Sequence, residues 1–99
     1  MNNNIKPESI YQLINKDYCF IDIRDQYQFK KLHIKNFINV PYTNIYQYQF
    51  PIQKPIILIC YSGEKAKRIA DDLCQKGYRA YYIDGGFQAV ININQSQYY

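Results

Sequence analysis

The sequence is poor in cysteine, and its cysteines are not arranged as a disulfide framework or a metal site. There are three, Cys19, Cys60 and Cys74, with no Cys-x-x-Cys pair and no cysteine–histidine spacing of the kind that binds zinc. In a reducing compartment all three are expected to be free thiols. Each of them therefore has to be judged by its surroundings, and we expect no structural metal.

Long apolar runs and continuous basic tracts are also missing. No run approaches the roughly eighteen residues that a membrane-spanning helix needs, and the first residues lack the basic-then-apolar order of a secretion signal, so we expect a cytoplasmic protein. The formal net charge is +4, but the basic residues are not gathered in one tract: three lie in segment 30–35, three in segment 65–68, and the others are scattered. Solvated surface charge explains this division better than nucleic-acid binding does. A mild positive field still favours a small anionic substrate.

Nothing in the sequence divides the chain. Its 99 residues suffice for one compact domain and are too few for two. The content of 47% hydrophobic and 20% charged residues is that of an ordinary globular protein, without internal repeats or a low-complexity linker. We therefore predict a single domain over residues 1–99, with a polar tail at 94–99 that is free to fray.

Short apolar runs alternate with helical patterns along the chain. The runs at 19–23, 37–42, 55–60 and 79–84 are predicted to be strands, the second of them ended by Pro41. Helices are predicted at 6–14, opened by Pro7, and at 25–32, with one or two further turns at 43–50 that Thr43 would cap.

The segment "PIILIC" is apolar on both alternating faces, which is typical of a central strand covered by helices on both sides. After it, apolar residues recur at helical spacing, and Gly77 stands where such a helix would end. Residues 56–83 are therefore predicted to form a β-α-β unit. The predicted fold class is α/β, with a small central parallel sheet flanked by helices on both sides.

Cys60 stands at the corner between this strand and this helix, and in open parallel sheets ligands bind beyond the carboxyl ends of the strands. Because "YSGEKA" joins strand to helix within a few residues, several backbone N–H groups should point at the Cys60 sulfur, and Gly63 permits the turn. These donors, the helix dipole and Lys65 would stabilise a nucleophilic thiolate at neutral pH. The alternative is a small apolar residue that merely ends a buried strand, and it leaves the tight turn and Gly63 unexplained.

Three motifs, in the right order, resemble the rhodanese-like sulfurtransferases. The first, "IDIRDQYQFKKLHIKNFINVPY", is similar to the Asp-x-Arg, His-Ile and Asn-hydrophobic-Pro pattern of that family. The second, "CYSGEKA", is similar to its Cys-x-x-Gly-x-Arg-(Ser or Ala) loop, and the third, "IDGGFQAV", to its Asp-Gly-Gly motif. The resemblance extends over a core of residues 5–93.

The resemblance implies a sulfurtransferase reaction at Cys60. This cysteine would attack the outer sulfur of a donor such as thiosulfate, polysulfide or a protein persulfide, hold a persulfide, and pass the sulfur to a thiol or to cyanide. The N–H donors stabilise the anionic persulfide without a metal, so no organic cofactor is expected. The expected partners are a small anionic sulfur donor and a thiol acceptor, which includes a thiol on a protein, and neither nucleic acid nor a membrane.

The resemblance also implies roles for individual residues. Asp22 and Arg24 resemble family residues beside the loop, where they would orient it, although a local ion pair explains them equally well. His33 matches a position that is usually structural, and we prefer a satisfied histidine over a general base. Cys19 and Cys74 are predicted to be core residues. The active-site loop would consist of Cys60, Tyr61, Ser62, Gly63, Glu64 and Lys65.

Lys65 in this loop and Ala66 directly after it bear on the choice between possible functions. Family members commonly have arginine where this chain has Lys65, and lysine lacks the fork that binds an oxyanion at two points. We therefore expect weaker use of thiosulfate, and the alternative function is a non-turnover sulfur carrier or regulatory binding module on the same fold. The resemblance implies that related phosphatases carry an arginine six positions after the cysteine. Ala66 occupies that position here, which disfavours phosphatase activity.

Overall fold

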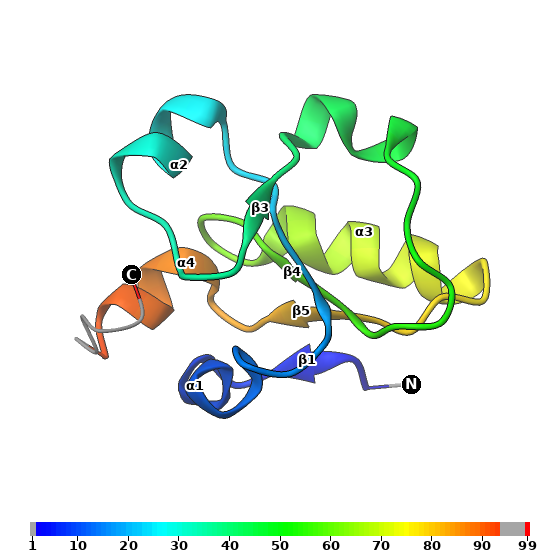
Figure 1. Ribbon diagram of the computed structural model, residues 1–99, viewed down its shortest axis with the longest axis horizontal. Helices are drawn as coiled ribbons and strands as arrows, with labels where there is room; N and C mark the ends of the chain where they lie inside the picture. The colour runs from blue at the N-terminus through cyan, green and yellow to red at the C-terminus, as the bar shows by residue number, and fades with distance from the viewer. Residues whose placement is uncertain (1, 94–98) are drawn as a thin grey trace.

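The computed structural model describes residues 2–93 and 99, and a parallel five-stranded sheet lies at its centre (Figure 1). The order of the strands across the sheet is β1-β5-β4-β2-β3, and all neighbouring pairs are parallel. The central position of β4 confirms the prediction made from "PIILIC". The strands are β1 (Asn4–Ile5), β2 (Cys19–Asp22), β3 (Ile38–Asn39), β4 (Ile56–Ile59) and β5 (Ala80–Ile83).

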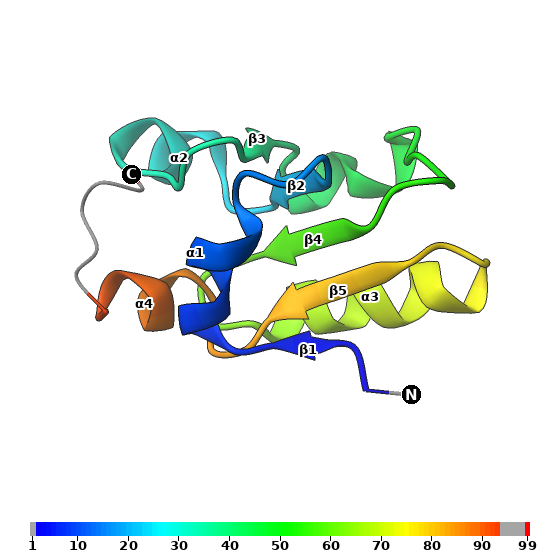
Figure 2. The ribbon, with the colours of Figure 1, turned by 60° about the horizontal axis from the view of Figure 1, so that its bottom comes forward.

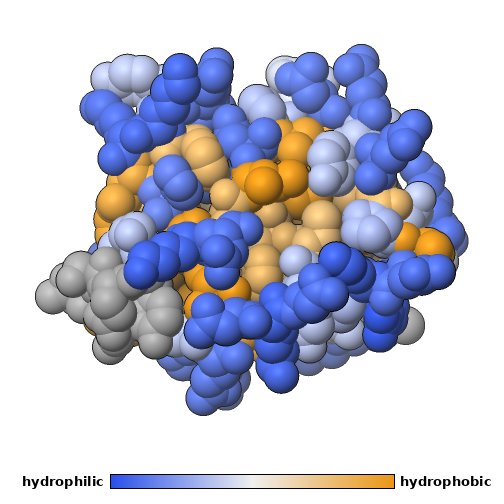
Figure 3. Space-filling model, viewed as in Figure 1, coloured by the Kyte–Doolittle hydropathy of each residue, from blue (hydrophilic) through white to orange (hydrophobic). Residues whose placement is uncertain are grey.

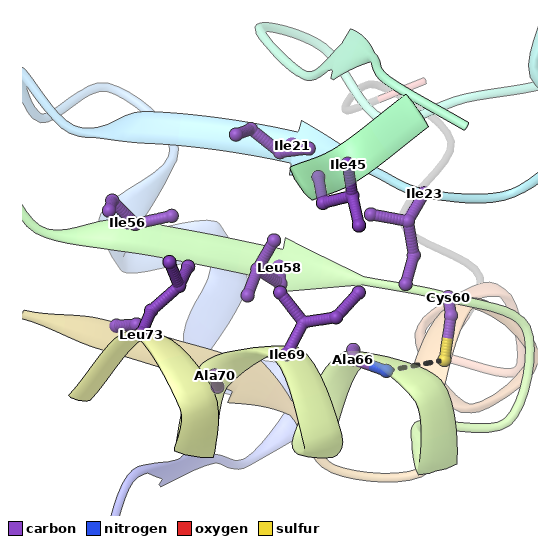
Figure 4. Close-up of a cluster of buried hydrophobic side chains, with 11 residues drawn as sticks. Ile21, Ile23, Ile45, Ile56, Leu58, Cys60, Ala66, Ile69, Ala70 and Leu73 are labelled. Carbon is purple, nitrogen blue, oxygen red and sulfur yellow. Dashed lines mark hydrogen bonds between the residues drawn. The ribbon is translucent and has the colours of Figure 1, made fainter. Parts of the chain in front are cut away.

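Helices cover both faces of the sheet (Figures 1 and 2). They are η1 (Pro7–Ser9), α1 (Ile10–Leu13), α2 (Gln26–Lys31), η2 (Tyr42–Gln47), α3 (Glu64–Gln75) and α4 (Gly86–Ile91). Alternate residues of β4 enter two separate core clusters. Leu58 packs in the cluster that contains α3 and η2 (Figure 4), and Ile57 packs in the cluster that contains α1 and α4. Burial on both faces accounts for the uninterrupted apolar sequence of this strand, and it confirms the α/β fold class.

The β-α-β unit is also confirmed, since α3 joins β4 to its parallel neighbour β5. The apolar side of α3 faces the core. Cys74 on it is half-buried, and its other four members are buried, namely Ala66, Ile69, Ala70 and Leu73. Gly77 follows the helix at a φ of 96°, the left-handed conformation predicted for it.

One detail of the prediction is wrong. Thr43 does not cap the turns that follow β3, because η2 begins one residue earlier, at Tyr42, and the Thr43 hydroxyl instead donates to Asn44 Oδ1 at 3.1 Å. The strand predicted to end at Pro41 is present and short, Ile38–Asn39. Backbone contact with the β2 side continues past it, since the N–H of Tyr42 donates to the carbonyl of Ile23 at 3.0 Å.

On the face viewed in Figure 1, hydrophilic side chains surround a middle region where apolar side chains are visible (Figure 3). Within the described residues, no helix combines the length and the apolar character that crossing a bilayer requires. The predicted fraying tail lies outside the described residues, except for Tyr99, whose hydroxyl donates to the carbonyl of Val90 at 3.1 Å.

Candidate active site

Cys60 directly follows β4, at the carboxyl edge of the sheet, and only 5% of it is exposed. Its Sγ accepts hydrogen bonds from the backbone N–H of Gly63 at 3.1 Å and of Ala66 at 3.4 Å, the second of which is drawn in Figure 4. Gly63 is the N-cap of α3, so both donors belong to the start of that helix. The N-terminus of a helix stabilises negative charge. The sulfur therefore lies where two N–H donors and the start of a helix stabilise negative charge.

The second donor, Ala66, lies outside the loop that was predicted to cradle the sulfur. Sequence reasoning considered only its side chain. The signal that identifies it is the helix pattern, because the first N–H groups of a helix have no partner within the helix and remain free to bind an anion. A helix that begins at Glu64 places the N–H of Ala66 one turn after the cap, facing the sulfur.

The start of α4 contacts the backbone of the active-site loop from behind. The N–H of Phe87 donates to the carbonyl of Cys60 at 2.7 Å, and the N–H of Gln88 donates to the carbonyl of Tyr61 at 3.2 Å. Gly86 lies so close that an added Cβ would come within 2.5 Å of both carbonyl oxygens. These hydrogen bonds and the Gly86 contact fix the positions of the two carbonyls. They give "IDGGFQAV" a physical role beside the active-site loop.

A cavity of about 390 Å³ opens above Cys60. Three loops at the same edge of the sheet form it, those that follow β2, β3 and β4. Of the predicted loop residues, Tyr61, Ser62, Glu64 and Lys65 line it and Gly63 does not, whereas the residues from the other two loops were largely missed. Their positions after β2 and β3, whose carboxyl ends meet at this edge, are the signal that finds them. The lining residues are Ile23, Arg24, Asp25, Gln28, Pro41, Tyr42, Thr43, Cys60, Tyr61, Ser62, Glu64 and Lys65.

Asp22 and Arg24 form a buried ion pair beside the cavity. The Nη2 of Arg24 lies 2.9 Å from Oδ2 of Asp22, and the two side chains are 5% and 1% exposed. Arg24 also donates to the carbonyl of Leu32 at 2.6 Å, and its guanidinium lies 3.7 Å from the centre of the Phe87 ring. The pair thus links β2 to the loop before β3 and to α4. Its predicted role in orienting the active-site loop stays a prediction.

The side chain of Lys65 reaches the opposite wall, where its Nζ lies 4.9 Å from the centre of the Tyr42 ring. A cation over an aromatic face is held there by the charge distribution of the ring. Lys65 is therefore kept at the side of the cavity, as a single point charge.

The other thiols and the histidine have structural surroundings. His33 donates from Nδ1 to the carbonyl of Phe29 at 2.8 Å, and its imidazole stacks on the Phe29 ring. The Cys74 thiol donates to the carbonyl of Ala80 at 3.2 Å. Burial raises the pKa of the Cys19 thiol, which keeps it protonated and unreactive. In the part of the chain that the structure describes, no three histidine, cysteine or carboxylate side chains gather closely enough to hold a metal ion.

The sequence matches the model of the rhodanese-like domain family over residues 6–92. The chain belongs to this family. Among curated members, it is 31% identical over 94 residues to the protein named thiosulfate sulfurtransferase GlpE of Shewanella oneidensis, covering 88% of this chain and 93% of that one. It is 33% identical over 73 residues to the protein of the same name in Tolumonas auensis, covering 71% of this chain and 69% of that one.

Solved structures of rhodanese-like proteins share the fold. A rhodanese-related protein of Thermoplasma volcanium superimposes with a TM-score of 0.84, at 25% identity over 92% of both chains. A rhodanese-like domain protein of Staphylococcus aureus gives 0.80, at 20% identity over 91% of both chains. The rhodanese-like family inferred from the three motifs is thus confirmed.

Proposed function

We propose that this rhodanese-like domain is a sulfurtransferase that moves a sulfane sulfur from thiosulfate, a polysulfide or a protein persulfide to a thiol or to cyanide, through a persulfide on Cys60. The observation that carries the proposal is the pair of backbone N–H groups, of Gly63 and Ala66, on a cysteine sulfur that lines a cavity. The names of the curated relatives point to the same reaction.

The geometry supports a two-step exchange at one sulfur. The Cys60 thiolate attacks the outer sulfur of thiosulfate, the new S–S bond forms as the old one breaks, and sulfite leaves with the electron pair. An acceptor thiolate or cyanide then attacks the outer sulfur of the persulfide, and Cys60 returns to a thiolate. The two N–H groups stabilise the anion that is present before and after each step, and a prearranged donor costs no reorganisation during the reaction.

The remaining predicted site residues act on the donor or on the loop. In this proposal, Tyr61, Ser62, Glu64 and Lys65 face the donor, and the Arg24–Asp22 pair holds the neighbouring loops in place. The reaction belongs to one domain, residues 1–99 with the core at 5–93. It needs a free thiol at Cys60, which a reducing compartment such as the cytoplasm maintains.

The alternative is a sulfur carrier or regulatory module that accepts sulfur without turning over small donors, and Lys65 in place of arginine favours it. Intact mass under non-reducing conditions, after incubation with thiosulfate or polysulfide, separates the possibilities. We expect the wild type to gain one sulfur and Cys60→Ser to gain none. Saturable transfer to cyanide then supports the enzyme, and loading without turnover supports the carrier. Equal loading of wild type and Cys60→Ser contradicts both.

A further inference from the structure

The charged side chains that line the cavity do not suit a dianion. Two are cationic, Arg24 and Lys65, and two are anionic, Asp25 and Glu64. The charge of Arg24 is offset by Asp22, 2.9 Å away. Once Arg24 is paired with Asp22, the lining has one cation left, Lys65, beside two carboxylates, those of Asp25 and Glu64.

Positive potential is confined to the floor of the cavity. There, the start of α3 directs two N–H groups at the buried Cys60 sulfur. Glu64 and Asp25 are exposed instead, at the first residue of α3 and at the N-cap of α2. Thiosulfate that places its outer sulfur on the floor leaves its charged sulfite group in a cavity that both carboxylates line. Like charges repel one another.

The walls also offer apolar surface that an inorganic donor cannot use. Ile23, Pro41 and Tyr42 line the cavity, and Tyr61 beside them is 55% exposed. The volume of about 390 Å³ is far larger than a handful of atoms requires, and it falls in the range of roughly 300–1,000 Å³ that is usual for small organic ligands. A carbon-bound group on the donor sulfur would bury apolar surface here.

On the basis of the proposed function, we propose that Cys60 takes its sulfur from a small organic persulfide, R–S–SH, and that Glu64 selects against dianionic donors. The Cys60 thiolate attacks the terminal sulfur, a bond forms between the two sulfurs, and the S–S bond of the donor breaks. The electron pair leaves on R–S⁻, and Cys60 carries –S–SH. Atoms, charge and electrons balance without a further oxidant or reductant. The leaving group carries less charge than sulfite, while R packs on the apolar wall.

The test compares two donors, cysteine hydropersulfide and thiosulfate, on the intact chain. Single-turnover loading of Cys60 is followed by rapid quench and intact mass, and each rate is divided by the rate of the same donor with free cysteine, which removes intrinsic reactivity. The variant is Glu64→Gln. The matched control is Asp17→Asn, which also removes one negative charge, but from an exposed residue before β2, at the opposite edge of the sheet.

We expect the normalised rate of the wild type to be about tenfold higher for the persulfide, and Glu64→Gln to raise the thiosulfate rate by about three- to tenfold. The gain should shrink at high salt, because salt screens exposed charges. Asp17→Asn should change neither rate. The inference is overturned if thiosulfate loads Cys60 as fast as the persulfide, or if Glu64→Gln alters both donors equally. If neither donor loads the wild type, the proposed function itself fails, and this inference fails with it.

Discussion

Replacing Gly86 by alanine tests whether the start of α4 holds the active-site loop in position. Gly86 has a φ of 69°, and an added Cβ would come within 2.5 Å of the carbonyl oxygens of Cys60 and Tyr61. Gly77 provides the matched control. Its φ is 96°, and a Cβ there would meet nothing within 4 Å. Both variants strain the backbone, but only Gly86→Ala pushes on the loop.

The two variants should lose different amounts of free energy of unfolding. A left-handed backbone at a residue with a side chain costs about 1–2 kcal/mol, so Gly77→Ala should lose about that much free energy of unfolding. Gly86→Ala adds an overlap with backbone atoms that have little room to move, and overpacking of this kind costs about 1–3 kcal/mol more. The total for Gly86→Ala is then roughly 2–5 kcal/mol.

Urea unfolding measures the stability of both variants, and single-turnover sulfur loading of Cys60 measures the state of the loop. If the loop carbonyls shift, the N–H groups of Gly63 and Ala66 move off the sulfur. The loss of about one such hydrogen bond should slow loading about tenfold in Gly86→Ala. Gly77→Ala should load at the wild-type rate, since it is remote from the loop. The reasoning is refuted if Gly86→Ala is no less stable than Gly77→Ala and loads sulfur as fast as the wild type.

Two further predictions concern charge and pH. Asp22→Asn leaves the buried Arg24 without its counter-charge and should lower the free energy of unfolding by about 3–5 kcal/mol; an unchanged urea midpoint would contradict the assigned pair. The hydrogen bond to Asp72 raises the pKa of Tyr46 from 10.0 to about 12, so the neutral phenol is favoured in the folded state. Its contribution is complete below pH 10 and is lost as the pH rises to about 12. Because Tyr46 is 56% exposed, we expect a loss of only about 1 kcal/mol. Melting temperatures between those pH values should fall less steeply in Tyr46→Phe than in the wild type, and parallel curves would show that this tyrosine does not contribute.

The centre of the fold was predictable because the apolar pattern of its residues indicates which side chains are buried. β4 alternates Ile56 and Leu58 toward α3 with Ile57 and Ile59 toward α1 and α4, so both faces had to be apolar. The edges were not predictable in this way. β1 has two residues, Asn4–Ile5, too few to show a period, and it is a strand only because it pairs with β5. The six residues of α4 begin after a left-handed Gly85 and have no capping side chain.

In the candidate site, too, local contacts were predictable from the sequence and contacts between distant segments were not. Backbone N–H groups that point at the Cys60 sulfur were predicted from the short connection between strand and helix, because only local geometry is involved, and that of Gly63 is one of them. The Gly86 contact and the facing of Lys65 toward Tyr42 join segments that are distant in sequence. No local pattern reports such contacts. They had to come from the fold, which brings the loops after β2, β3 and β4 to one edge of the sheet.

The hydrogen bonds to the Cys60 sulfur come from the main chain, at Gly63 and Ala66, and not from side chains. Any residue but proline supplies an N–H, so the parts that hold the sulfur do not depend on which side chains the loop carries, as long as its backbone path is kept. The side chains of Tyr61, Ser62 and Glu64 line the cavity instead, and in the proposed function they face the incoming donor. Reactivity and selectivity are thus encoded in separate atoms of the same few residues. A new donor preference can therefore be engineered, or evolve, one side chain at a time without dismantling the nucleophile.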